Sequence, residues 1–141
     1  MELFGYRKLI VYRKSKELVR HTYRLLNKFP SIEKHAMCDQ LRRSSISITS
    51  NIAEGVNRFS VKEKIHFIEI SFASLMELSS QFEIAEDLGY PSQEVVQLLK
   101  DSEFPGMKVL EFAFGANEDS VYLPHCIKRF LQMDSYQRSY P

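Results

Sequence analysis

The clearest chemistry that this sequence offers is the binding of phosphate groups by positive charge. Five cations recur every three or four residues near the N-terminus: Arg13, Lys16, Arg20, Arg24 and Lys28. This spacing places them along one face of a helix. Spaced cations on a rigid helix can contact successive phosphates, and the release of counterions then favours binding. Further positive charge comes from Arg42, Arg43, Arg58 and Lys62. We therefore expect an RNA- or DNA-binding face on the first two helices.

The same cations have a plainer interpretation as a solvated helix face. Arg24 and Lys28 would lie near the C-terminus of a helix, where positive charge is favourable, and Arg43 would pair with Glu77. This interpretation is favoured for a single subunit. In a ring of several copies, however, the stripes would add into one continuous basic surface. No aromatic platform for stacking bases is evident, so sequence-specific readout is not expected.

Patterns that could support catalysis are incomplete. Glu63 and His66 have the Glu-x-x-His spacing of di-iron bundles, but such sites need two of these pairs and two more glutamates. Cys38 follows His35 at helical spacing, yet no third group completes a nucleophilic site, and a buried thiol is the better interpretation. No glycine-rich phosphate loop is present in the sequence. We expect no enzyme activity, no cofactor and no metal site.

Charge is divided unevenly along the chain. Residues 1–64 contain 14 basic and 6 acidic residues, whereas residues 65–141 contain 5 basic and 12 acidic residues. The net charges of the two parts are therefore +8 and −7, which agrees with +1 for the whole chain. This division suits a basic face for a polyanion. It equally suits a protein-interaction module in which the basic part of one copy docks the acidic part of another.

Composition is typical of one soluble globular domain. The 141 residues are 44% hydrophobic and 26% charged. No apolar run approaches the ~20 residues that cross a bilayer, and the N-terminus does not resemble a signal peptide. The two cysteines are too few for a disulfide framework. A cytoplasmic protein without membrane contact is expected.

Helical periodicity dominates the first 100 residues. Residues 11–28 place Tyr12, Tyr23 and several leucines on one apolar stripe before Pro30. Residues 33–56 form a second periodic run. Between Ile46 and Ile48 this run also alternates like a strand, but the longer helical pattern from Leu41 to Val56 favours a helix.

The third helix has the clearest ends. Ser60 and Glu63 form a capping-box pattern, and Gly89 supplies a stop about 29 residues later. A fourth helix is expected from residue 91, broken near Pro105. These elements predict an all-α, antiparallel up-down-up-down four-helix bundle over residues 1–115, with residues 116–141 as an irregular extension that combines a short helix and a flexible tail.

Three blocks of sequence resemble a known family. The stretch DQLRRSSISITSNIAEGVNR is similar to the hallmark of the 23S rRNA intervening-sequence proteins, and LIVYRKSKELV and FIEISFASLMELSSQFEIAEDLGY agree in order. The resemblance implies a four-helix bundle without known catalytic activity. It also implies a homo-oligomer, of which a pentameric ring is one form. The related accessory proteins of diversity-generating retroelements bind nucleic acid and a reverse transcriptase.

The motif residues of this resemblance are polar or small. They are Asn51, Glu54, Gly55, Ser74 and Glu77. We expect Asn51, Glu54, Ser74 and Glu77 to form half-buried polar contacts that fix helix register, because buried polar groups need partners. Gly55 would either allow the close approach of another backbone or end the second helix. The family commonly has proline at Thr49 and alanine at Ser71.

Overall fold

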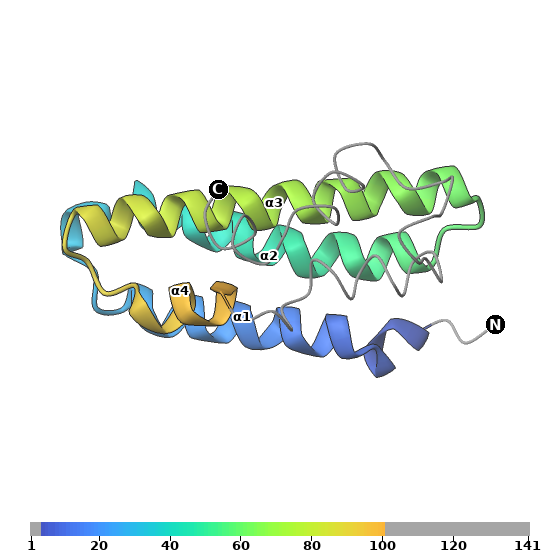
Figure 1. Ribbon diagram of the computed structural model, residues 1–141, viewed down its shortest axis with the longest axis horizontal. Helices are drawn as coiled ribbons and strands as arrows, with labels where there is room; N and C mark the ends of the chain where they lie inside the picture. Colours follow the sequence, from blue (N-terminus) through green and yellow to red (C-terminus); the bar gives the residue numbers. More distant parts are fainter. Residues whose placement is uncertain (1–3, 101–141) are drawn as a thin grey trace.

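The computed structural model describes residues 4–100, which form four α-helices and two short 3-10 helices (Figure 1). The α-helices are α1 (Ile10–Leu26), α2 (Met37–Val56), α3 (Val61–Asp87) and α4 (Gln93–Lys100). The 3-10 helices are η1 (Gly5–Lys8) and η2 (Ser31–Glu33). No strand occurs within this range, so the all-α prediction is confirmed and the Ile46–Ile48 stretch is helical. The predicted break at Pro105 and the extension after residue 115 lie outside the described residues.

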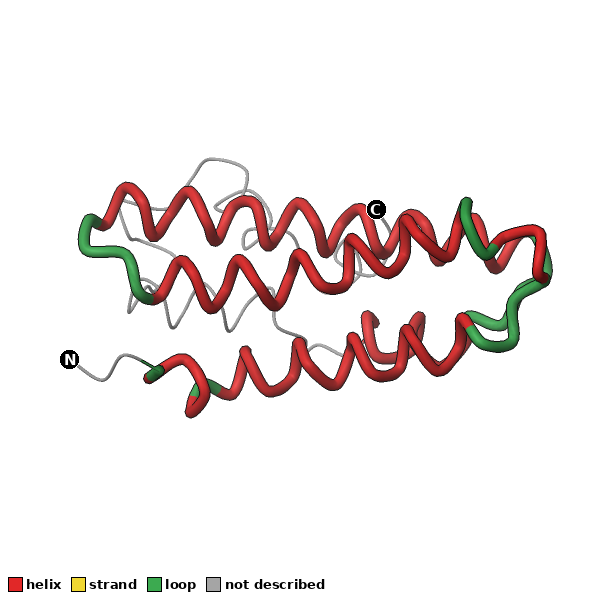
Figure 2. The backbone as a smooth tube through the Cα atoms, turned by 180° about the vertical axis from the view of Figure 1, so that it is seen from behind, coloured by secondary structure: helices red, strands yellow, loops and turns green. Residues whose placement is uncertain are grey.

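Helices α2 and α3 lie side by side along most of their length (Figures 1 and 2). The hydroxyl of Ser44, early in α2, donates to Gln81, late in α3, at 2.9 Å. Further along α2, the hydroxyl of Ser47 lies 2.7 Å from that of Ser74. Because residue numbers fall in α3 as they rise in α2, the two helices run in opposite directions.

Both ends of α3 are set by local sequence. The Ser60 hydroxyl accepts a hydrogen bond from the N–H of Glu63 at 3.1 Å and donates to the Glu63 carboxylate at 3.0 Å. At the other end, Gly89 has φ +75°. Its N–H donates to the carbonyl of Glu86, and the N–H of Tyr90 donates to that of Ala85. This is a Schellman ending, which glycine favours because a side chain would be strained at positive φ.

The start of α2 differs from the sequence prediction. The expected helix began at residue 33, but residues 31–33 form η2 and α2 begins at Met37. Ala36 has φ −120° and ψ −102°, which interrupts the helix. The Glu33 carboxylate accepts from the N–H of Met37 at 3.2 Å and from the hydroxyl of Tyr90 at 3.0 Å. Glu33 therefore caps α2 from outside it and ties its start to the end of α3.

The core draws on all four helices. Its most buried large side chains include Leu18 of α1, Leu41 of α2, Phe82 of α3 and Val95 of α4. These side chains lie at the spacing that the sequence predicted for the apolar stripes. None of the helices within residues 4–100 is long and apolar enough to cross a membrane.

Candidate nucleic-acid interface

The outer face of α1 carries positive charge that no carboxylate within residues 4–100 neutralises. Arg13, Lys16 and Arg20 are exposed, and none of them forms an ion pair with another described residue. The Lys16 ammonium lies 5.7 Å from the centre of the Tyr12 ring, a cation–π contact. Lys28 is exposed two residues beyond the end of the helix. Helix α1 therefore presents a row of available cations.

Arg24 belongs to the same row but has an acidic neighbour. Its guanidinium lies 3.5 Å from the carboxylate of Glu94 in α4. The same carboxylate oxygen is hydrogen-bonded to Nδ1 of His21. These contacts join α4 to α1, and the charge of Arg24 is partly neutralised by Glu94.

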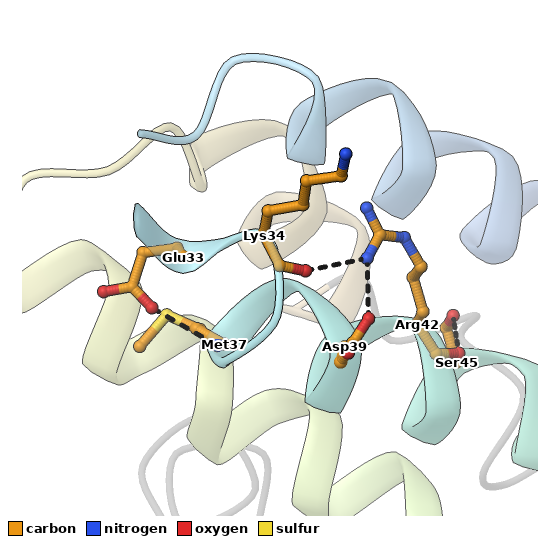
Figure 3. Close-up of polar contacts among 6 residues, drawn as sticks. All are labelled: Glu33, Lys34, Met37, Asp39, Arg42 and Ser45. Atoms are coloured by element: carbon orange, nitrogen blue, oxygen red, sulfur yellow. Dashed lines mark hydrogen bonds and ion pairs between the residues drawn. The ribbon is translucent and has the colours of Figure 1, made fainter. Parts of the chain in front are cut away.

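Arg42 is held in place on α2 by two oxygen atoms. Its Nη1 donates to the Asp39 carboxylate at 3.0 Å and to the backbone carbonyl of Lys34 at 3.4 Å (Figure 3). The guanidinium lies 5.9 Å from the centre of the Tyr23 ring on α1. Arg42 therefore bridges the two helices at the end of the bundle where the α1–α2 connection lies.

The remaining predicted cations, Arg43, Arg58 and Lys62, differ in their surroundings. Arg43 is exposed and does not form the expected pair with Glu77, whose carboxylate instead accepts from Gln81 at 3.0 Å. Arg58 forms an ion pair with Glu54, and its guanidinium lies 4.5 Å from the centre of the Phe67 ring. Lys62 is exposed and has no ion pair with a described residue. The sequence-predicted cations therefore divide into those without a carboxylate partner in residues 4–100 (Arg13, Lys16, Arg20, Lys28, Arg43 and Lys62) and those with one (Arg24, Arg42 and Arg58).

Three of the motif residues, Asn51, Gly55 and Ser74, lie at the seam between α2 and α3. The expectation of half-buried contacts was wrong for the other two: Glu54 and Glu77 are exposed, and they contact Arg58 and Gln81 instead. The Asn51 amide donates to the carbonyl of Ser47 at 2.7 Å and lies 3.1 Å from the Ser47 hydroxyl, which is bonded to Ser74. The buried hydroxyl of Ser71 donates to the carbonyl of Ile48 at 2.9 Å. Short polar side chains thus satisfy one another where the two helices meet. Such contacts favour one register, because a shift would leave buried polar groups unpaired.

Gly55 lies at a close approach of α3 to α2. A Cβ at this position would stand 2.9 Å from Cβ of Phe67 and 3.5 Å from the carbonyl oxygen of Lys64. Carbon atoms in contact are normally separated by about 3.5–4.0 Å. The glycine therefore provides the close helix approach, one residue before α2 ends at Val56.

The residues considered for catalysis do not assemble into a site. Cys38 is buried, and burial raises the pKa of its thiol above the ordinary value, which disfavours the reactive thiolate. His35 is exposed on the α1–α2 connection. Across residues 4–100, no three His, Cys, Asp or Glu side chains are grouped so that they could hold a metal ion.

Comparison with known proteins identifies the family. The family model of the 23S rRNA-intervening sequence protein matches residues 7–104, which include α1 to α4 and both the basic face and the serine-rich seam. The chain belongs to the 23S rRNA-intervening sequence protein family. The resemblance that the Asn-Ile-Ala-Glu-Gly motif indicated is thereby confirmed.

A second, shorter similarity connects this 23S rRNA-intervening sequence protein to a family of enzymes. It is 45% identical to a 4-alpha-glucanotransferase of Clostridium butyricum over 65 residues. These residues make up 46% of this chain and 11% of that enzyme. Over 42 residues, 30% of this chain, it is 57% identical to the chloroplastic/amyloplastic 4-alpha-glucanotransferase of Solanum tuberosum. Over a stretch of the same length, it is 50% identical to a 4-alpha-glucanotransferase of Streptococcus pneumoniae. The chain spans only 7% and 8% of the length of these last two enzymes.

Sequence reasoning missed two features of this family member's surface. Tyr23 was assigned to the buried apolar stripe of the first helix, but its side chain is 39% exposed. The restraint of Arg42 by Lys34 was also missed, because it uses a backbone carbonyl eight residues away. Only the ion pair with Asp39 had a sequence signal, namely opposite charges three residues apart on one helix.

Proposed function

We propose that this 23S rRNA-intervening sequence protein is a non-enzymatic oligomeric scaffold that binds RNA or DNA through the outer face of α1 and the adjoining part of α2. The observation that carries the proposal is the exposure of Arg13, Lys16 and Arg20 on one face without a carboxylate partner among the described residues. Such cations are free to exchange their solution counterions for phosphates.

The geometry of α1 supports contact with a nucleic-acid backbone. Arg13 and Arg20 are separated by two turns, or about 10.5 Å at 1.5 Å per residue. The helix is held rigid by the buried side chains of its opposite face, among them Leu18 and Leu25. Contacts with phosphates carry no sequence information, so binding on this face is set by charge and shape. In a homo-oligomer such as a pentameric ring, several copies of the face would act together.

A salt-titrated binding assay on a structured RNA hairpin tests this proposal. Arg20→Gln is expected to weaken binding and to reduce the slope of log affinity against log salt by about 0.9, the value for one lost phosphate contact on a duplex. Lys14→Gln is the matched control, because Lys14 lies on the same helix but its ammonium is 3.9 Å from the carboxylate of Glu17. The proposal fails if the protein does not bind at low salt, or if the two variants behave alike.

The second candidate function is a protein-interaction module without nucleic-acid binding. Glu83, Glu86 and Asp87 are exposed on α3, and none has an ion-pair partner within the part of the chain that the structure describes. The basic face of one copy could dock this acidic region of another. High salt should then dissociate the oligomer on a sizing column, and added RNA should leave its size unchanged.

Glucan transfer is not part of the proposed function. The chain spans about a tenth or less of the glucanotransferases to which it is similar, and the residues discussed as catalytic candidates do not form a site. Incubation of the purified chain with a 4-alpha-glucan should leave the distribution of glucan lengths unchanged. A redistribution of lengths would overturn the non-enzymatic part of the proposal.

A further inference from the structure

Tyr23 is a surface aromatic side chain beside the basic face of α1. Its side chain is 39% exposed, and Arg42 of α2 lies over its ring with the guanidinium 5.9 Å from the ring centre. The ring is therefore neither a core side chain nor an isolated surface group. It stands at the junction of α1 and α2, with a cation on one side and solvent on another.

The position of Arg42 is restrained before any partner binds. Its Nη1 donates a hydrogen bond to the Asp39 carboxylate and another to the Lys34 carbonyl (Figure 3). A side chain already held in one rotamer loses little entropy when a ligand contacts it. The guanidinium and the Tyr23 ring thus form a pre-organised pair.

Phosphate-binding charge lies within one or two turns of this pair. Arg20 is three residues before Tyr23 and Lys16 is seven before it, so both share its side of the helix. Along a single strand, bases and phosphates alternate on a scale of several ångströms, comparable with the ~5.4 Å pitch of the helix. An aromatic face with cations one turn away is the arrangement with which proteins hold unpaired bases.

We propose that Tyr23 and Arg42 form a stacking site for an unpaired base of a single-stranded nucleic acid whose phosphates contact Arg20 and Lys16. The site rests on the proposed nucleic-acid binding and specifies its ligand as a strand with unstacked bases, such as a loop or an end. Stacking accepts any base, because every base has a π-face, so the site selects single strands over duplexes and reads little sequence.

The test compares strands that have the same backbone charge but differ in their bases. Fluorescence anisotropy is measured with a labelled 12-nucleotide oligouridine, with an abasic strand of equal length, and with a 12-base-pair duplex. Tyr23→Leu should weaken oligouridine binding by about tenfold, the effect of losing one stacked base, and leave the other two affinities unchanged. Tyr23→Phe keeps the ring and should bind oligouridine within about twofold of the unsubstituted protein.

Phe59→Leu is the matched control. Phe59 is a surface aromatic with 88% exposure on the α2–α3 connection, and no described cation lies over its ring. This variant should bind all three probes normally. Equal thermal melting of Tyr23→Leu and the unsubstituted protein shows that the variant is folded.

Two results would overturn the stacking site and leave the proposed function standing. One is unchanged oligouridine binding by Tyr23→Leu. The other is an equal loss of affinity for the abasic strand, which would show that the ring supports the cations rather than a base. By contrast, failure of the unsubstituted protein to bind any of the probes at low salt would overturn the proposed function itself.

Discussion

Replacement of Gly55 by alanine tests the close approach of α2 and α3 directly. The new Cβ would stand 2.9 Å from Cβ of Phe67. This is at least about 0.6 Å inside the normal carbon–carbon contact distance. A change of rotamer at Phe67 cannot relieve the overlap, because the position of Cβ is set by the backbone. The two helices must therefore move apart locally.

The expected loss of stability follows from two opposing effects. Overpacking of a close interface costs about 1–3 kcal/mol. Alanine is favoured over glycine by about 1 kcal/mol in a helix interior, and by less near a helix end such as that of α2. The net result should be a decrease of about 1–2 kcal/mol in the free energy of unfolding. For a chain of this size, that corresponds to a Tm lower by about 3–7 °C.

Denaturant and thermal unfolding followed by circular dichroism provide the assay. Protein concentration is kept constant, because association would make Tm depend on it. Gly5→Ala is the matched control, since a Cβ at Gly5 would have no atom within 4 Å. Its stability should change by no more than about 0.5 kcal/mol, as for most surface substitutions. A Gly55→Ala variant as stable as the starting protein would refute the close-approach account.

Four further predictions concern other residues. Ser71→Ala should change the free energy of unfolding, measured by urea titration, by less than about 1 kcal/mol. The substitution removes the hydroxyl donor, and the carbonyl of Ile48 that accepted from it still takes part in the backbone hydrogen bonds of α2. In a Cys126→Ser background, native Cys38 should react with iodoacetamide much more slowly than the unfolded chain, as followed by mass spectrometry. Because folding raises the pKa of this thiol, its contribution to stability is complete below the ordinary pKa of 9.0 and is lost as pH rises above it, which urea titrations at pH 8 and 10 should detect. Glu94→Gln should accelerate amide hydrogen exchange in α4 while lowering overall stability by less than about 1 kcal/mol, since its contacts with α1 are partly exposed.

The ends of α3 were predictable because they depend on neighbours in sequence. Ser60 and Glu63 satisfy the first N–H groups, and Gly89 takes the positive φ that ends the helix. The start of α2 was predicted four residues too early for the opposite reason. Its cap is the carboxylate of Glu33, whose other oxygen is held by Tyr90 from the far end of α3. The contact between Glu33 and Tyr90 joins residues far apart in the sequence, so capping rules based on neighbouring residues do not predict it.

In the candidate interface, too, features that depend on helical spacing were predicted, and features that depend on neighbouring helices were not. Helical spacing correctly placed Arg13, Lys16 and Arg20 on an exposed face. It did not predict that Tyr23 would be exposed, since an aromatic residue on an apolar stripe is normally buried. The pair of Arg43 with Glu77 was also expected from approximate register, yet Glu77 bonds within its own helix. Partner choice depends on side-chain direction, which spacing alone does not determine.

The narrow contact between α2 and α3 also limits how this protein can change over generations. Any side chain at residue 55 would bring its Cβ to 2.9 Å from Cβ of Phe67, and every residue at position 67 except glycine keeps that atom. Position 55 is therefore restricted to glycine as long as the two helices keep this separation. The charged side chains on the outer side of α1 are under no comparable steric restriction. Substitutions there can change what the protein binds, whereas the distance between α2 and α3 can change only with difficulty.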